Sequence, residues 1–191
     1  MSSPFIIISS PSGGGKSTIT KKILHSSRRF AKTISATTRP PRSGEVDGRD
    51  YYFLSKEQFQ SYIQADKFLE WEEVYEGLCY GTLNSEIENL AQHQKVGILV
   101  LDIHGALELK KRFKDRVLTI FLDIPSMEVL KERLQYRGTE SPESIQKRLD
   151  RTAYELSFKD QFDIVIPNIQ VTQTVEQCME AIDAFLHKLN F

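Results

Sequence analysis

The chain has 191 residues, of which 40% are hydrophobic and 27% charged, and its formal net charge is −1. Its length fits one compact domain, and its composition excludes intrinsically disordered, collagenous and disulfide-scaffold proteins. A net charge so close to zero gives no global basic field for a nucleic acid, and no apolar run approaches the length of a membrane span. We therefore expect neither a nucleic acid nor a membrane as partner.

The N-terminus and the cysteines indicate a cytosolic protein. Residues 1–4 carry no basic side chain, and the apolar run that follows is too short for a secretory signal. Cys79 and Cys178 lie far apart in no metal-ligand spacing, so we interpret them as reduced thiols. We expect a cytoplasmic protein, and we leave open whether it is a monomer or a homodimer.

Short apolar runs alternate with helical patterns along most of the chain. The runs that predict buried strands are 5–8, 97–102, 117–123 and 162–166, and the patterns that predict the helices after them are 18–27, 106–113, 126–136 and 174–189. Buried strands that alternate with helices form right-handed βαβ units. The sequence therefore predicts an α/β fold with a parallel sheet that helices cover on both faces.

Two segments interrupt this alternation. One helix among the shorter strand signals begins at a capping box formed by Ser55 and Gln58, and a second, charged helix begins at Ser141 and Pro142, a natural N-cap and first-turn proline. The shorter strand signals are 32–36, 51–54, 68–75 and 78–80. We expect one domain with a core formed by 1–34, 83–136 and 159–191, an inserted mixed α+β region at 35–82 and a helical lid at 137–158.

A glycine-rich loop directly follows the first predicted strand. A strand, a glycine-rich loop ending in Gly-Lys-Ser and a helix form the context of a phosphate-binding P-loop, so we expect a P-loop NTPase-type core. Lys16 would place its charge at the β- and γ-phosphates, while the Ser17 hydroxyl can bind Mg²⁺. Ser10 stands where the general pattern has glycine, which we expect to alter the turn without removing the site. The predicted ATP-binding residues are Ser10, Pro11, Ser12, Gly13, Gly14, Gly15, Lys16, Ser17 and Thr18.

Asp102 ends the second long buried strand. In open α/β sheets ligands collect at the carboxyl ends of the strands, so Asp102 should face the same crevice as the P-loop. A carboxylate there can hold Mg²⁺ directly or through water. A role as helix N-cap is a compatible alternative.

The segment 35–51 is polar, rich in turn residues and locally basic. Arg39 and Arg42 flank two prolines that stiffen the backbone between them. Guanidinium groups match phosphate oxygens, so this pair suits a small dianion. Charge alone would equally fit an ordinary solvated loop.

This segment resembles the GMP-binding signature of guanylate kinases, a T-T-R-x-P-R core followed by G-E-x-x-G-x-D-Y. The stretches 68–71, 80–82, 102–105, 137–140 and 147–149 resemble further motifs of the family, in the family's order. The similarity covers nearly the whole chain. It implies Mg²⁺-dependent transfer of the γ-phosphate of ATP to GMP, and to dGMP, with ADP and GDP as products.

The resemblance also implies roles for single residues. An ionised Glu70 would accept hydrogen bonds from N1 and N2 of guanine, whereas the bare N1 acceptor of adenine would leave it unmet. Arg137 and Arg148, with Arg133 as a third member, would close over the transferring phosphoryl group beside Lys16, and Arg151 is the weakest candidate. The implied GMP-binding residues are Ser35, Arg39, Arg42, Tyr51, Glu70, Tyr80, Thr82 and Asp102, and Asn168 would lie near the adenine.

The match fails at one place. The family reads D-x-Q-G after this strand, often with another acidic residue two places earlier, but here His104 replaces the glutamine and Val100 fills the earlier position. Asp102 should therefore act without a nearby carboxylate. We interpret His104 as a cap of the next helix, and a pH-dependent hydrogen bond to a nucleotide is the alternative.

Two other functions are compatible with parts of this pattern. A guanylate-kinase-like protein-interaction module without catalysis typically lacks a working phosphate loop, whereas Lys16 and Ser17 are present here. A P-loop kinase for another monophosphate is disfavoured by Glu70 within its matching motif. The sequence therefore favours an ATP:GMP phosphotransferase.

Overall fold

The computed structural model describes residues 4–11, 13–75, 77–136 and 142–191, and it contains two β-sheets. In the larger sheet the strand order is β2-β7-β1-β8-β9, and every pairing is parallel. Its strands are β1 (Phe5–Ser9), β2 (Phe30–Lys32), β7 (Val96–Val100), β8 (Val117–Asp123) and β9 (Ile164–Pro167). The parallel sheet confirms the predicted α/β class.

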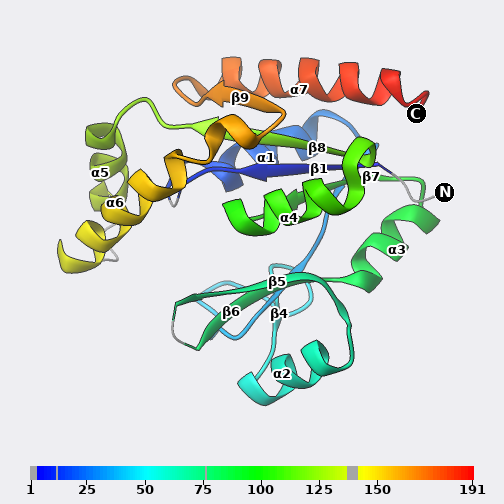
Figure 1. Cartoon of the computed structure of the whole chain (residues 1–191), viewed down its shortest axis with the longest axis horizontal. Helices are drawn as coiled ribbons and strands as arrows, with labels where there is room; N and C mark the ends of the chain where they lie inside the picture. The colour runs from blue at the N-terminus through cyan, green and yellow to red at the C-terminus, as the bar shows by residue number, and fades with distance from the viewer. Residues whose placement is uncertain (1–3, 12, 76, 137–141) are drawn as a thin grey trace.

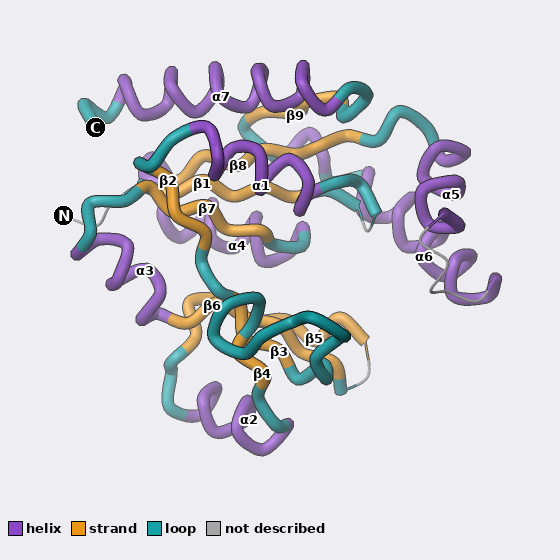
Figure 2. Tube along the Cα trace, turned by 180° about the vertical axis from the view of Figure 1, so that it is seen from behind, coloured by secondary structure: helices purple, strands orange, loops and turns teal. Residues whose placement is uncertain are grey.

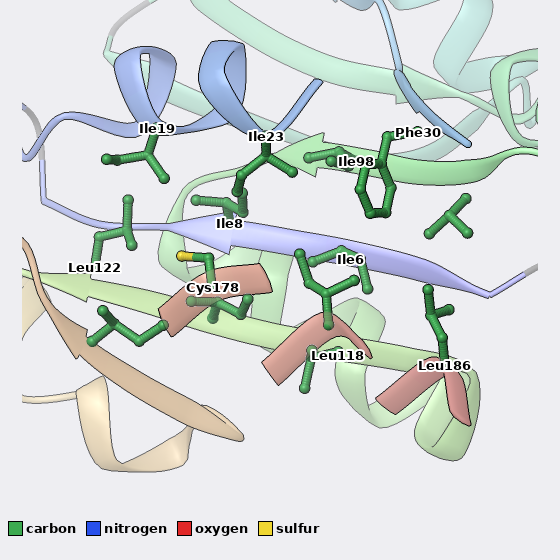
Figure 3. Packing of buried hydrophobic residues seen from close by; sticks show 14 residues of the cluster. Ile6, Ile8, Ile19, Ile23, Phe30, Ile98, Leu118, Leu122, Cys178 and Leu186 are labelled. Atoms are coloured by element: carbon green, nitrogen blue, oxygen red, sulfur yellow. The ribbon is translucent and has the colours of Figure 1, made fainter. Parts of the chain in front are cut away.

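Helices cover both faces of this sheet (Figure 1). On one face, Ile6 and Ile8 of β1 pack with α1 (Lys16–Ser26) and α7 (Val171–Lys188), as Figure 3 shows for Ile23 and other side chains of this cluster. On the other face, Phe5 and Ile7 pack against α4 (Ile103–Phe113). Alternate residues of β1 thus enter two separate cores, which is why the strand is a continuous apolar run.

The smaller sheet lies beyond α4, as the two views in Figures 1 and 2 show, and its order is β4-β3-β6-β5. Its strands are β3 (Ser35–Thr37), β4 (Tyr52–Phe53), β5 (Phe68–Tyr75) and β6 (Leu78–Leu83). Helix α2 (Lys56–Gln64) packs on it through Phe59, whose ring stacks on Phe68 at 4.4 Å. The predicted capping box is confirmed, because the Ser55 hydroxyl accepts from Gln58 N and the Gln58 side chain accepts from Ser55 N.

The chain passes from the larger to the smaller sheet at residues 33–34. The sequence predicted one strand over 32–36, and this is wrong, because the segment divides into β2, which pairs with β7, and β3, which pairs with β6. The chain returns through α3 (Asn84–Gln92), a helix that was not predicted. The sequence over 32–36 gives one continuous strand signal, but residue 32 pairs within the larger sheet and residues 35–36 pair within the smaller one.

At one end of the larger sheet, α5 (Met127–Tyr136) packs against α6 (Pro142–Leu156) (Figure 1). Two short 3-10 helices, η1 (Lys114–Arg116) and η2 (Lys159–Gln161), precede β8 and β9. The division of the chain into core, insertion and lid stays a prediction. Among the described residues, no helix has both the length and the apolar character that crossing a membrane requires.

Candidate active site

The loop between β1 and α1 has the backbone that its glycines predict. Gly13 and Gly15 have φ of 86° and 97°, a region that L side chains rarely adopt. Gly15 is the N-cap of α1, no side chain caps the helix and its first turn holds no acidic residue. The first-turn N–H groups and the helix dipole are thus directed at whatever anion enters the loop. Ser12 lies outside the described residues.

Ser10 fits this loop by turning inward. Its side chain is buried, and its hydroxyl donates to the Pro11 carbonyl at 3.0 Å. A Cβ on Gly14 would come within 2.6 Å of Ser10 Oγ, so the serine requires glycine opposite it. The Lys16 ammonium donates to the Ser10 carbonyl at 2.5 Å and lies over the loop.

Asn168 supports the loop from the side of β9. Its side chain is buried, its Nδ2 donates to the Gly14 carbonyl at 2.7 Å, and its Oδ1 accepts from the Thr174 hydroxyl at 3.2 Å. A Cβ on Gly15 would lie 2.5 Å from Asn168 Nδ2. The structure therefore gives this residue a positioning role, and its contact with adenine stays a prediction.

Asp102 lies beside the P-loop at the carboxyl edge of the sheet. Parallel pairing of β1 with β7 aligns the two strand ends, and the Ser9 hydroxyl donates to the Leu101 carbonyl at 3.0 Å. Asp102 is the N-cap of α4, where its Oδ1 accepts from Gly105 N at 2.9 Å. The predicted cap by His104 is therefore wrong, because Asp102 already holds that place.

The residues predicted to read guanine lie in one row across the smaller sheet. Ser35 of β3 pairs with Thr82 of β6, and Thr82 pairs with Glu70 of β5. Residues directly opposite in antiparallel strands place their side chains on the same face. Strand pairing thus brings together Ser35 and Thr82, which are 47 residues apart in the sequence.

Two atoms in this row have unmet hydrogen-bonding capacity. Glu70 is 5% exposed, and its Oε1 and the Thr82 hydroxyl are buried without a hydrogen-bond partner among the described residues. Burial raises the pKa of the Glu70 carboxyl to about 7, and the charge of Asp102 acts in the same direction. An unmet buried carboxylate is costly, so this row is poised for a ligand that donates hydrogen bonds.

A second group of predicted residues gathers beside this row. The Arg39 guanidinium lies 5.3 Å from the ring centroid of Tyr51, and the rings of Tyr51 and Tyr80 are 6.2 Å apart. Arg39 Nη2 also contacts both oxygens of Glu45 at 2.8 and 2.9 Å, while Arg42 donates its backbone N–H to the same carboxylate and exposes its side chain. The sequence did not single out Glu45, which holds Arg39, although it stands in the G-E of the quoted signature.

The sequence model of one family, described as guanylate kinase, matches residues 2–185. The chain belongs to the guanylate kinase family. It is 45% identical to the guanylate kinase of Porphyromonas gingivalis over 96% of this chain and 98% of the relative, and 48% identical to that of Chlorobium luteolum over 95% and 91%.

Solved structures agree with this family assignment. The crystal structure of guanylate kinase from Anaplasma phagocytophilum superposes with a TM-score of 0.77 at 30% identity, covering 96% of this chain and 86% of that one. Shikimate kinase from Bacteroides thetaiotaomicron superposes over 94% of this chain and 98% of that one, with a TM-score of 0.50 and 13% identity, which shows the shared fold alone. The predicted P-loop kinase-type core is thereby confirmed.

Little of the predicted lid chemistry of a guanylate kinase can be placed. Arg133 and Arg148 belong to α5 and α6, and Arg137 lies outside the described residues. The Arg151 side chain is placed, and its Nε donates to Glu155 Oε1 at 2.8 Å. The phosphoryl-contacting roles of the first three arginines stay predictions.

One expectation about the acidic residues near Asp102 is corrected. Asp102 does have a neighbouring carboxylate, but it comes from β5 instead of β7: Glu72 lies within hydrogen-bonding reach of Asp102. Burial and this contact raise the pKa of Glu72. Strand β5 carries Glu70, Glu72 and Glu73 in near succession, and only the pairing register shows which of them face the site.

Proposed function

We propose that this chain transfers the γ-phosphoryl group of ATP to GMP, with the P-loop as its donor site and the smaller sheet as its acceptor site. Membership of the guanylate kinase family gives the reaction class. The residue assignments below are inferred from the geometry of this chain.

The buried, unpartnered Oε1 of Glu70 carries the assignment of the base. Guanine presents N1–H and N2–H₂ along one edge and a carbonyl oxygen beside them, and an ionised carboxylate accepts from the two N–H groups. The hydroxyls of Ser35 and Thr82, in the same row, would donate to the carbonyl oxygen. Adenine has a lone pair at N1, so it would leave Glu70 buried and unmet.

The phosphates would be held at two separate places. The GMP phosphate would bind Arg39, Arg42 and the hydroxyls of Tyr51 and Tyr80. The ATP phosphates would bind the first-turn N–H groups of α1 and the Lys16 ammonium, which would leave its contacts with the loop carbonyls. Asn168, which holds the Gly14 carbonyl, would keep the P-loop in the position that binds these phosphates.

Magnesium would be held mainly by the nucleotide. No group of three or more His, Cys, Asp or Glu side chains in the described part of the chain has the arrangement of a metal site. Ser17 and Asp102 offer oxygen ligands at the same sheet edge, and this set fits Mg²⁺, which keeps several waters and takes one or two protein ligands beside phosphates. A bound Mg²⁺ would neutralise charge on the phosphate oxygens.

The remaining assignments rest on the resemblance to the family. Arg133, Arg137 and Arg148 would approach the γ-phosphoryl group from the helical segment, where fixed positive charge lowers the barrier. Acceptance of dGMP, a cytoplasmic location and the choice between monomer and homodimer remain predictions.

Coupled measurement of ADP release tests this function. The substrates are MgATP with GMP, dGMP, AMP, UMP or dTMP, and the variants are Lys16→Ala and Glu70→Gln. We expect turnover of GMP and more slowly of dGMP, loss of activity in the first variant, and weaker base selection in the second. Lys22→Ala, an exposed lysine on α1, is the matched control and should retain activity. Binding of GMP without turnover by the unmodified chain would favour the interaction module instead.

A further inference from the structure

Glu72 is placed at the acceptor site by the pairing of β5 with β6. The register there is regular, with Glu70 opposite Thr82, Trp71 opposite Gly81 and Glu72 opposite Tyr80. Alternation along a strand therefore puts Glu72 on the same face as Glu70. Glu72 stands one step further along that face than the row assigned to the base, directly opposite the tyrosine assigned to the phosphate.

Helix α4 brings a third carboxylate to this place. The Arg112 guanidinium of α4 donates to the Leu69 carbonyl of β5 at 3.1 Å, which holds the helix against the strand. A Cβ built on Gly105 would be 3.0 Å from Glu70 Oε2 and 3.7 Å from both Asp102 oxygens. The N-terminus of α4 is therefore in close contact with the carboxylate-bearing face of β5.

The carboxylates of Glu70, Glu72 and Asp102 have more acceptor oxygens than there are donor groups around them. Glu72 Oε2 is buried and accepts from no donor within the described ranges, and Glu70 Oε1 is in the same state. The Arg151 guanidinium reaches the other oxygen of Glu72 only at 3.8 Å, beyond hydrogen-bonding distance. Nor does this cluster, in the part of the chain that the structure describes, form a metal-holding group. A ligand edge with several N–H groups would meet both unpaired oxygens.

We propose that Glu72 is a further specificity-determining residue of the acceptor site, which accepts a hydrogen bond from the 2-amino group of guanine. This inference rests on the proposed GMP kinase function. A carboxylate that binds guanine through N1–H and one N2–H leaves the second N2–H free, directed along the edge toward the ribose. Glu72 lies on that side of Glu70, toward Tyr80.

Inosine monophosphate, which differs from GMP only in lacking the 2-amino group, is the probe. We would measure kcat/KM for GMP, dGMP and inosine monophosphate with the unmodified chain, Glu72→Ala and Glu72→Gln. In Glu72→Ala we expect kcat/KM for GMP and dGMP to fall about tenfold or more, as for loss of a hydrogen bond that leaves its buried partner unmet. The value for inosine monophosphate should change by less than about twofold, because that substrate never made the contact. Glu72→Gln, which keeps an acceptor oxygen, should show a smaller fall in the same direction.

Glu73→Gln is the matched control, because Glu73 is exposed, directly follows Glu72 in β5 and lies on the opposite face of that strand. It should leave all three values unchanged. Thermal unfolding of each variant checks its fold, and the isosteric Gln variant keeps the test open if the Ala variant does not fold.

Three results would overturn the inference. An equal fall for GMP and inosine monophosphate would show that Glu72 acts through Arg151 and α6, and a fall for GMP that spares dGMP would show a ribose contact. If Glu72→Ala kept full activity and the same ratio of kcat/KM for GMP to kcat/KM for inosine monophosphate, Glu72 would make no contact with the ligand. In each case the unmodified chain still turns over GMP, so failure of the proposed function, which is absence of that turnover, is a separate outcome.

Discussion

The carboxylate of Glu86 joins the two segments that connect the sheets. Its Oε2 accepts from the backbone N–H of Ile34 at 2.7 Å, and its Oε1 accepts from the Tyr52 hydroxyl at 2.9 Å. Ile34 lies where the chain leaves the larger sheet, and Glu86 lies on α3, by which the chain returns. One buried side chain thus fixes the orientation of the smaller sheet, the proposed acceptor site, at the point where it joins the larger sheet.

Replacing Glu86 by Ala should therefore destabilise the protein. The change leaves the Ile34 N–H in a partly buried place without its acceptor, which costs about 1–3 kcal/mol. Urea denaturation would measure the free energy of unfolding. Glu88→Ala, an exposed glutamate on the same helix, is the control and should change it by less than about 0.5 kcal/mol. Equal effects of the two changes would contradict the role given to Glu86.

The raised pKa of Glu70 predicts a pH dependence of GMP binding. Burial places the pKa at about 7 in the free protein, and guanine is read by the ionised form. GMP affinity should therefore fall as the pH falls below 7, approaching about tenfold per pH unit. Calorimetric titration from pH 5.5 to 8 measures this, and Glu70→Gln serves as the control because it lacks the titration of Glu70 and keeps those of Glu72 and of the GMP phosphate. The same slope in both proteins would contradict the prediction.

The same pKa has an opposite consequence for folding. A carboxyl whose pKa is raised from its ordinary value of 4.5 to about 7 holds its proton in the folded state after the unfolded chain has lost it. The Glu70 carboxyl therefore favours folding at a pH below about 4.5. This contribution to the free energy of unfolding is lost as the pH rises from about 4.5 to 7. Glu70→Gln should raise the melting temperature at pH 8 by roughly 2–4 °C or more, since 1 kcal/mol has about that effect in a chain of this size. An unchanged or lower value in a thermal scan would refute this.

Asn168→Asp should weaken ATP binding. The change replaces the Nδ2 donor by an oxygen that faces the Gly14 carbonyl, so the P-loop loses its lateral support. We expect KM for ATP to rise about tenfold with KM for GMP nearly unchanged, for a loss of about 1–3 kcal/mol. Steady-state kinetics with each substrate varied in turn separates the two, with Asn89→Asp on the exposed side of α3 as control. A parallel rise of both KM values would point to a general loss of fold.

Arg39 and Arg42 should differ in importance, although the sequence treats them alike. Arg39 is held by Glu45 and lies against Tyr51, whereas the Arg42 side chain is exposed. Arg39→Lys should raise KM for GMP about tenfold or more, because lysine cannot keep the two-pronged contact, and Arg42→Lys should raise it less. GMP kinetics of the two variants decide this, and a larger effect at Arg42 would reverse the assignment.

The elements that were predicted well are those whose burial is indicated by the apolar pattern of their own residues. Strands β1, β7 and β8 lie between two helical layers, so each is a mostly apolar run. Helices α1, α4 and α7 begin two or three residues before their predicted starts, because Gly15, Asp102 and Gln170 are their N-caps. The P-loop was visible because its chemistry needs fixed residues at fixed spacing.

The errors arose where pairing partners decide the outcome. Nothing local to residues 32–36 tells that Lys32 pairs with Ile98 and Ser35 with Thr82. Glu72 looked like one of several strand glutamates until the register placed it beside Asp102. Glu86 sits in an unpredicted helix, and its partners are 52 and 34 residues away.

The way the smaller sheet is attached to the larger one also determines how it should unfold locally. The chain enters that sheet once, at residue 34, and leaves it once, at α3, and Glu86 links these two points to each other. Backbone amides of β3, β5 and β6 should then exchange with deuterium as one cooperative unit, at a rate distinct from that of β1 and β8. Weakening the Glu86 link should accelerate exchange throughout that unit while the amides of the parallel sheet keep their protection.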